Sequence, residues 1–205
     1  MAVEAFKQQK ANTAIRIPSF GLTGEISSGK STYADHLKTG IEVEMGINLY
    51  RPSFSSKITE IARDLFDMEG KDRVLLGEIG LKMREIDPHV WTKYVIKDIR
   101  KNNKLPFAVD GLRFIHDVEL FKQNFEDFVM IRIDAEEKQR FEAYKKTYGK
   151  YPTKEELKNK GEGDITKLPF DIRLVNNYER AELESQIQDV IGSIRKGTIW
   201  DLLRK

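Results

Sequence analysis

Residues 24–31 of this chain read GEISSGKS and match the pattern G-x-x-x-x-G-K-[ST] at every fixed position. The apolar residues 20–22 come just before the motif, and a helical pattern over residues 32–38 comes just after it. A motif of this kind joins a buried strand to a helix, so it points to a fold in which parallel strands alternate with helices. We expect the first strand to begin at Pro18, because a proline lacks the N–H that a residue in a central strand donates.

The rest of the chain continues this alternation. Further extended or apolar runs lie at residues 47–54, 105–109, 128–133 and 172–175. Apolar stripes at helical spacing separate them, one of which comprises Ile58, Ile61, Ala62, Leu65 and Phe66. The sequence therefore predicts an α/β protein with three layers, in which helices flank a parallel sheet of about five strands. Residues 136–167 are rich in charge and aromatic rings, and predict a helical lid inserted into a single domain over residues 1–205.

Composition narrows the class of protein. The chain has no cysteine, which excludes disulfides, thiol catalysis and cysteine-ligated metal clusters, and favours a reducing cytoplasm, the host's cytoplasm if the protein is viral. No apolar stretch approaches the roughly 20 residues that cross a bilayer, so we expect neither a membrane partner nor a secretory signal. With 35 basic against 33 acidic residues, the net charge of +2 gives no reason to expect nucleic-acid binding.

The residue types of the motif suit a triphosphate. Glycines let main-chain N–H groups approach an anion, and the helix N-terminus that follows adds positive potential. Lys30 is expected to reach the β- and γ-phosphates, and the Ser31 hydroxyl to ligate a magnesium ion that bridges them. The sequence thus predicts ATP and Mg²⁺ as cofactors, held by Gly24, Ile26, Ser27, Ser28, Gly29, Lys30, Ser31 and Thr32. A glycine-rich turn that binds nothing is the alternative.

Several segments resemble those of known kinases. Residues 20–32 (FGLTGEISSGKST) resemble the opening of dephospho-coenzyme A kinases, while residues 75–95, 107–121 and 168–183 resemble segments of phage-type deoxynucleoside monophosphate kinases. Both families are P-loop kinases, so the resemblance implies the three-layer P-loop NTPase fold. The longer set of segments implies transfer of a phosphoryl group from ATP to a nucleoside or deoxynucleoside monophosphate, giving the diphosphate.

Two other functions remain open. Dephospho-coenzyme A kinase is one, although the acidic D-A-D element of that family is absent here, where residues 51–54 read RPSF. The other is a phage kinase or nucleotide-dependent module that acts on nucleic acid through residues 136–167. That segment carries nine basic and seven acidic residues, and this balance argues against it. The oligomeric state stays open as well, with a homodimer as one alternative.

Further candidate residues follow the predicted strands. Asp110 ends the run at 105–109, at the edge of a sheet where α/β proteins bind ligands, so we expect it to hold magnesium or to orient the acceptor. Arg113 has the planar fork that grips an acceptor phosphate. The resemblance implies a second acceptor-phosphate ligand in Arg84 and a lid arginine in Arg140. For each of them an ordinary capping or surface role is the alternative.

The last candidates rest on position and residue type. Asp35 lies one helical turn after Ser31 and is a candidate base or outer-shell magnesium ligand, with an ordinary helix acid as the alternative. Phe54 and Trp91 are candidates for stacking on an acceptor base, although large aromatic residues more often belong to a core. The resemblance places Asn177, in the turn after the last strand, beside the base of ATP, with a residue that simply forms the turn as the alternative.

Overall fold

The structure is a computed structural model, and it describes residues 16–157 and 165–203. Within these residues four parallel strands form one sheet in the order β2-β1-β3-β4. The strands are β1 (Ser19–Thr23), β2 (Ala108–Asp110), β3 (Phe128–Asp134) and β4 (Ile172–Val175). Every residue of β1 is buried, as expected for a central strand covered on both faces. Its start, one residue after Pro18, agrees with the prediction.

A fifth strand is reduced to a single bridge. Of the run predicted at 47–54, Tyr50 pairs with Phe107, in parallel and at the outer side of β2. Tyr50 donates its N–H to Pro106 O at 2.9 Å, and its own carbonyl accepts from Ala108 N at 2.8 Å. The pairing ends there because Pro52 has no N–H to donate and a helix begins at Phe54. The prediction of about five strands is therefore close: the fifth extended segment lies beside the sheet, but it pairs through one residue only.

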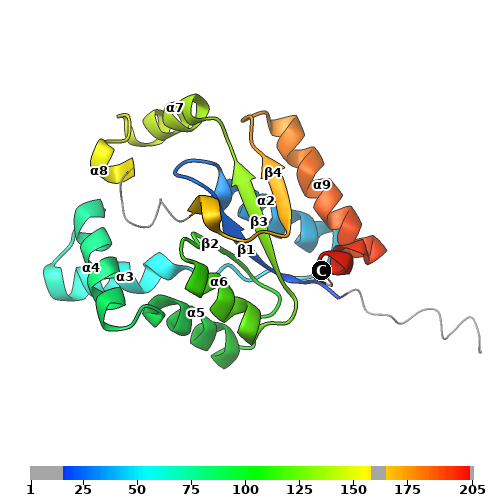
Figure 1. Ribbon diagram of the computed structural model, residues 1–205, viewed down its shortest axis with the longest axis horizontal. Helices are drawn as coiled ribbons and strands as arrows, with labels where there is room; N and C mark the ends of the chain where they lie inside the picture. Colours follow the sequence, from blue (N-terminus) through cyan, green and yellow to red (C-terminus); the bar gives the residue numbers. More distant parts are fainter. Residues whose placement is uncertain (1–15, 158–164, 204–205) are drawn as a thin grey trace, which may run out of the picture.

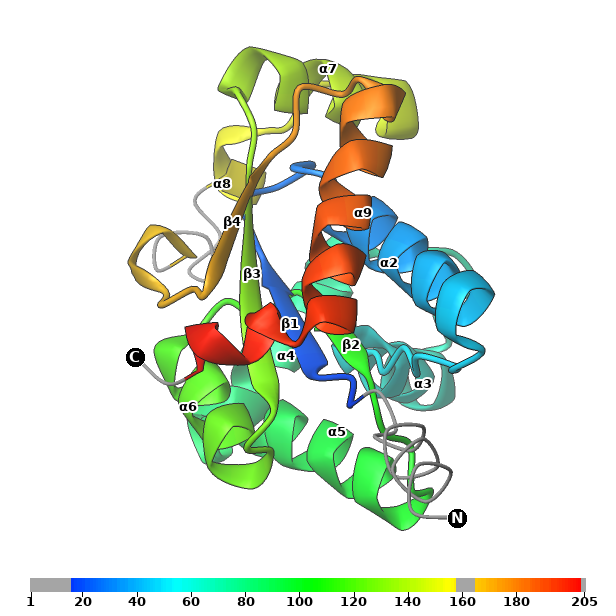
Figure 2. The ribbon, with the colours of Figure 1, turned by 90° about the vertical axis from the view of Figure 1, so that its right-hand side faces the viewer.

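Helices cover both faces of the sheet (Figures 1 and 2). They are α2 (Lys30–Met45), α3 (Phe54–Phe66), α4 (Arg73–Ile86), α5 (Val90–Lys101), α6 (Ile115–Asn124), α7 (Glu137–Tyr148), α8 (Lys154–Leu157) and α9 (Arg180–Lys196), with short 3₁₀ turns η1 (Ile165–Lys167) and η2 (Thr198–Leu202). Figure 2 shows α2 and α9 side by side on one face, where Leu37, Ile41 and Ile191 pack against Phe20 and Leu22 of β1. On the other face α5 and α6 pack a second apolar cluster against β2 and β3. The three predicted layers are thus present.

A third apolar cluster lies beyond β2 and holds together α3, α4 and the start of α5. Ala62 of α3 is buried in it, and Ile58 and Ile61 pack against it. The predicted apolar face of α3 is only partly used, because Leu65 is 72% exposed and Phe66 is 55% exposed. We call α3 and α4 together the helical unit. Arg84 of α4 lies over the ring of Phe114, in the segment that follows β2.

The predicted lid occupies the connection between β3 and β4. Figure 1 shows α7 and α8 beyond the carboxyl ends of the strands, on the side where the phosphate loop also lies. Arg73, at the start of α4, lies 3.9 Å from the centre of the Tyr148 ring in α7 and donates to the Tyr144 hydroxyl at 3.4 Å. The lid therefore touches the helical unit across the top of the sheet. Residues 158–164 of the predicted lid lie outside the described residues.

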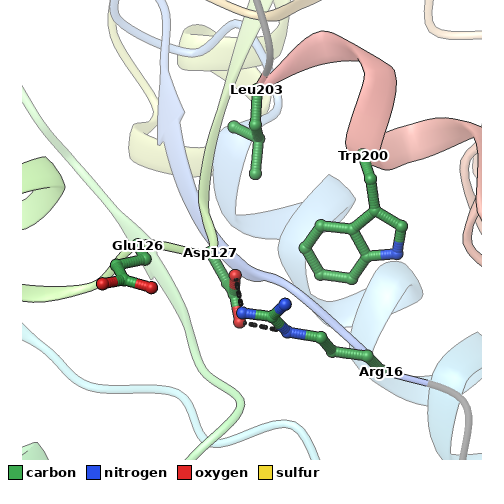
Figure 3. A pocket seen from close by; sticks show the side chains of 5 residues that line it. All are labelled: Arg16, Glu126, Asp127, Trp200 and Leu203. Carbon is green, nitrogen blue, oxygen red and sulfur yellow. Dashed lines mark hydrogen bonds and ion pairs between the residues drawn. The ribbon is translucent and has the colours of Figure 1, made fainter.

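A cavity of about 450 Å³ opens at the other end of the sheet, where the strands begin (Figure 3). Arg16 and Asp127, which precede β1 and β3, line it together with Glu126, Trp200 and Leu203. Arg16 donates from Nε to Asp127 Oδ2 at 2.7 Å and lies over the Trp200 ring at 5.0 Å. Ligands of parallel α/β proteins bind at the carboxyl ends of the strands, so this cavity is at the wrong edge to serve the phosphate loop. Among the described residues, no helix is both long and apolar enough to span a membrane.

Candidate active site

The phosphate loop connects the end of β1 to the first residue of α2, and two of its positions require glycine. Gly24 has a φ of +151°, and a Cβ there would lie 2.4 Å from the carbonyl oxygen of Ile133 in β3. Gly29 has a φ of +93°, and a Cβ there would lie 2.5 Å from Asn176 Nδ2. Both conformations are strained for other residues, and the clash at Gly29 involves Asn176, which holds the loop in place. The two fixed glycines of the motif are thus explained by geometry.

Three side chains from other elements hold the outside of this loop. Asn176 donates from Nδ2 to Ser28 O at 2.9 Å, and the Tyr178 hydroxyl donates to Ser27 O. Arg140 donates from Nη1 to Ile26 O at 3.3 Å. In a trans peptide the N–H points away from the preceding carbonyl, so binding these carbonyls from outside favours N–H groups that face the inside of the loop. One of them, Ser28 N, donates to Glu25 O of the loop at 3.1 Å. N–H groups that face inward are the arrangement that binds an anion.

Lys30 lies over the inside of the loop. Its Nζ donates to Gly24 O at 2.8 Å and to Glu25 O at 2.7 Å. The helix behind it, α2, has no side-chain cap on its N-terminus within the described part of the chain. An ammonium group and an uncapped helix N-terminus therefore face the same hollow, which favours a polyphosphate there.

Arg140, which is predicted to be a lid arginine, contacts the phosphate loop. Arg140 is 4% exposed and donates from Nε to Ala135 O at 3.1 Å, which fixes the start of α7. Its Nη2 lies 3.0 Å from Glu25 Oε2, so the guanidinium already pairs with a loop residue. Burial raises the pKa of the neighbouring Tyr178 hydroxyl, and the charge of Arg140 opposes that rise. Arg140 is thus one buried positive charge at the rim of the phosphate loop.

The two predicted magnesium ligands, Ser31 at the start of α2 and Asp110 at the end of β2, meet. Ser31 donates from Oγ to Asp110 Oδ2 at 2.5 Å. A hydroxyl and a carboxylate oxygen are ligands that Mg²⁺ accepts, and it takes its other ligands from phosphates and water. The described residues contain no cluster of three His, Cys, Asp or Glu side chains that would bind a metal ion by themselves. The donor set therefore fits a magnesium ion that arrives with a nucleotide.

An arginine that the sequence analysis did not select completes this edge. Arg51 Nη2 lies 3.6 Å from Asp110 Oδ2 and 3.6 Å from Asp35 Oδ1. Asp35 is thus near the predicted magnesium ligands, although its side chain is 70% exposed. The signal for Arg51 was present in the RPSF segment, where the dephospho-coenzyme A kinases carry acidic residues instead. Its meaning depends on a contact that the linear sequence does not show.

The two predicted acceptor arginines have different surroundings. Arg113 is half-buried in the loop after β2, and this loop is fastened to β1 by a hydrogen bond of 2.8 Å from Thr23 Oγ1 to Leu112 O. Arg84 donates to both carboxylate oxygens of Asp117, at 3.1 Å and 2.9 Å, and to Pro88 O at 2.6 Å. The Asp117 side chain is 2% exposed. This ion pair favours the structural alternative for Arg84, while the role of Arg113 stays a prediction.

The predicted aromatic ligands belong to the apolar clusters. Trp91 is 3% exposed, and its Nε1 donates to Gly80 O at 3.0 Å. Both faces of its ring are covered, so stacking on a base is excluded in this conformation and the prediction is corrected to a core role. Phe54 is half-buried and meets Phe121 edge to face at 6.2 Å, so it too supports the core.

Asn176 and Asn177, which follow β4, contact different parts of the structure. Asn176 supports the phosphate loop, a role that the prediction gave to neither residue. Asn177 accepts from Glu179 N at 2.9 Å and donates to the Glu182 carboxylate, both at the start of α9. Its carbonyl accepts from Gln139 Nε2 of α7 at 3.3 Å. The predicted contact of Asn177 with adenine stays a prediction, beside an observed role in capping α9.

Comparison with known proteins supports the fold. No protein-family model and no curated protein sequence matches the chain. Among solved structures, a gluconokinase from Sinorhizobium meliloti 1021 has a TM-score of 0.57 at 10% identity, with 90% of this chain and 97% of that chain covered. A shikimate kinase from Acinetobacter baumannii, in complex with shikimate, has a TM-score of 0.54 at 14% identity, with 89% and 96% covered. The fold is that of the P-loop kinases.

A shikimate kinase from Bacteroides thetaiotaomicron is similar to the same degree, with a TM-score of 0.53 at 10% identity and 87% and 98% of the two chains covered. The coverage shows that the similarity in fold extends over most of the chain. At such low identity the likeness concerns the fold. The residues described above must therefore carry any statement about the acceptor.

Proposed function

We propose that this protein is a kinase that transfers the γ-phosphoryl group of ATP to the phosphate of a nucleoside or deoxynucleoside monophosphate. One observation carries the proposal. Lys30 lies over the phosphate loop and the adjacent Ser31 donates to Asp110 at the end of β2, while side chains from other elements bind the carbonyls of residues 26–28 of the loop. Phosphoryl transfer needs positioning and charge neutralisation more than covalent chemistry, and these are the groups that supply both.

Each group has a defined task in this proposal. The loop and the N-terminus of α2 bind the phosphates, and Lys30 neutralises charge on the β- and γ-phosphates. Ser31 and Asp110 would hold Mg²⁺, which lowers the charge repulsion that the incoming acceptor meets. Arg140 adds a positive charge from the lid. Because α7 also contacts the helical unit through Arg73, the lid excludes water that would otherwise hydrolyse the nucleotide.

The engagement of the carboxylates favours a phosphate as the acceptor group. A hydroxyl acceptor needs a base to remove its proton, whereas a monophosphate is already an anion near pH 7. Asp110 accepts a hydrogen bond from Ser31, and both Asp110 and Asp35 lie beside the Arg51 guanidinium. Both carboxylates thus already have a partner in the protein. Arg51, which lies beside Asp110, and Arg113, three residues after Asp110 in the chain, would provide positive charge for an anionic acceptor.

A hydroxyl on a small anionic molecule is the second candidate acceptor. The structural neighbours include a gluconokinase and a shikimate kinase, whose names identify hydroxylated acids as acceptors. Dephospho-coenzyme A belongs to the same chemical class. In that case Asp35, the more exposed of the two carboxylates, would serve as the base.

A coupled assay of ADP release tests these functions together. The panel consists of ribo- and deoxyribonucleoside monophosphates, dephospho-coenzyme A, shikimate, gluconate and DNA, each with ATP and Mg²⁺. We expect ADP release to depend on a monophosphate, and to fall at least a hundredfold in Lys30→Ala. Lys196→Ala, which removes an exposed lysine at the far end of α9, is the matched control. ADP release that no monophosphate stimulates would rule out the proposed acceptor.

A further inference from the structure

Arg51 shares a carboxylate oxygen with the predicted magnesium ligand Ser31. Asp110 Oδ2 accepts the Ser31 hydroxyl at 2.5 Å and lies 3.6 Å from Arg51 Nη2. The same nitrogen lies 3.6 Å from Asp35 Oδ1. One guanidinium thus balances two carboxylates at the point where a divalent cation would bind. A divalent cation and this guanidinium would use the same negative charge.

The position of Arg51 is set by its neighbours in the chain. Tyr50 forms the bridge to Phe107, and its hydroxyl donates to Asp98 Oδ2 at 2.6 Å. Lys104 Nζ lies 4.1 Å from the centre of the Tyr50 ring. Pro52 follows Arg51 and is buried. The main chain is therefore anchored on both sides of Arg51, and the side chain, 20% exposed, stays at this edge of the sheet.

The contacts of Arg51 are charge contacts rather than hydrogen bonds. Both distances of 3.6 Å exceed the range of about 2.7–3.2 Å for N–H···O hydrogen bonds. Arg51 Nη1 is buried, and no hydrogen-bond acceptor lies within reach of it among the described residues. A bidentate pair of arginine and carboxylate would be much stronger. Arg51 thus neutralises Asp35 and Asp110 without being bound tightly to either, so another cation can replace it.

We propose that Arg51 is an internal competitor of the divalent cation. It neutralises Asp110 and Asp35 while the nucleotide site lacks metal, and it loses these partners when Mg²⁺ arrives with ATP. Arg51 therefore lowers the affinity of the site for metal and sets how strongly the metal strengthens nucleotide binding. The inference rests on the proposed function, because it requires a nucleotide that brings a divalent cation to Ser31 and Asp110.

The test measures binding without turnover. The dissociation constant of a non-hydrolysable ATP analogue is determined by calorimetry in Mg²⁺ and in EDTA, for the wild type, Arg51→Gln and Arg51→Lys. The ratio of the EDTA value to the Mg²⁺ value is the metal enhancement. We expect this ratio to rise about tenfold in Arg51→Gln, since one positive charge a few ångströms from the metal is removed in a partly screened environment. Arg51→Lys keeps the charge and is expected to stay within about threefold of the wild type.

Arg195→Gln is the matched control. Arg195 pairs with Glu44, near the other end of α2, about 20 Å along the helix from Ser31. Arg195→Gln removes one positive charge, as Arg51→Gln does, and in both cases the charge is paired with a carboxylate of α2. The metal enhancement of Arg195→Gln should equal that of the wild type. Thermal unfolding of each variant confirms that it is folded under the conditions of the titration.

The outcomes separate the two proposals. An unchanged or smaller metal enhancement in folded Arg51→Gln, with the analogue still bound by the wild type, would overturn the inference and leave the proposed function standing. A smaller ratio would mean that Arg51 supports the metal ligands instead of competing with the metal. A wild type that binds the analogue in neither condition would overturn the proposed function, and the inference with it.

Discussion

Gly24 shows how one residue can be required by two constraints at once. Its φ of +151° is available to glycine alone without strain, and a Cβ would approach the main chain of β3 to within 2.4 Å. Backbone atoms of a central strand cannot move aside as the tip of a side chain can. The residue therefore links the conformation of the phosphate loop to the packing of β1 against β3.

Gly24→Ala should for this reason abolish nucleotide binding and lower the free energy of unfolding by about 1–3 kcal/mol. Thermal unfolding with and without an ATP analogue measures both effects. Gly77→Ala is the control, because a Cβ at Gly77 in α4 has no neighbour within 4 Å and alanine favours a helix by up to about 1 kcal/mol. A Gly24→Ala protein stabilised by the analogue as much as the wild type would contradict the account of the loop.

At the scale of elements, the lid has a polar centre of its own. Tyr144 of α7 is fully buried, and its hydroxyl donates to Glu156 Oε1 of α8 at 2.8 Å. Thr153 N donates to Glu156 Oε2 at 2.7 Å, and Lys150 Nζ lies 3.2 Å from Oε1. These hydrogen bonds, led by that of Thr153, lower the pKa of Glu156 to about 2 against the opposing effect of burial. The ionised carboxylate thus joins α8 to α7.

A lowered pKa makes this contact sensitive to acid. Ionised Glu156 stabilises the folded lid in full above its ordinary pKa of 4.5, and the contribution is lost as the pH falls from there toward about 2. We expect a loss of about 1 kcal/mol after screening by solvent, seen as faster amide hydrogen exchange in α7 and α8 at low pH. Glu156→Gln should lack this dependence, while Glu184→Gln, on the exposed face of α9, should retain it. An identical acid response in Glu156→Gln and the wild type would count against the role of Glu156.

At the scale of the whole molecule, a buried ion pair fastens the helical unit to the sheet layers. Arg84 of α4 pairs with Asp117 of α6, and Thr92 of α5 donates its hydroxyl to the same carboxylate. Arg84 also lies 4.6 Å over the Phe114 ring. Three helices from two apolar clusters therefore meet at one carboxylate. The position of the helical unit relative to α5 and α6 depends on this joint.

Arg84→Gln should leave the Asp117 charge buried without its partner and lower the free energy of unfolding by about 3 kcal/mol. Urea unfolding measures the change, and Lys82→Gln, which removes an exposed lysine paired with Glu85 on the same helix, should change it by less than about 0.5 kcal/mol. If Arg84→Gln instead kept full stability and raised the KM of the acceptor, Arg84 would be the acceptor ligand that the resemblance implies.

Sequence reasoning located most elements because the signals for them are local. The strand at Ile172–Val175 was predicted with its observed bounds, and that at 128–133 differs by one residue. Runs buried on both faces and stripes at helical spacing can be read without knowing what covers them. Of the run at 47–54 only Tyr50 pairs, because an extended segment becomes a strand only where a neighbouring strand pairs with it. There the neighbour, β2, is short.

The site divides in the same way. The sequence alone determined the phosphate loop, Lys30, Ser31 and the edge of the sheet where Asp110 lies, because a contiguous motif and the direction of parallel strands fix those positions together. Only the tertiary structure decided that Arg84 pairs with Asp117, that Trp91 is covered, and that Arg51 lies between Asp35 and Asp110. Each of those outcomes depends on which side chains meet across packed elements, and a charge or ring carries no sign of its partner in the linear sequence.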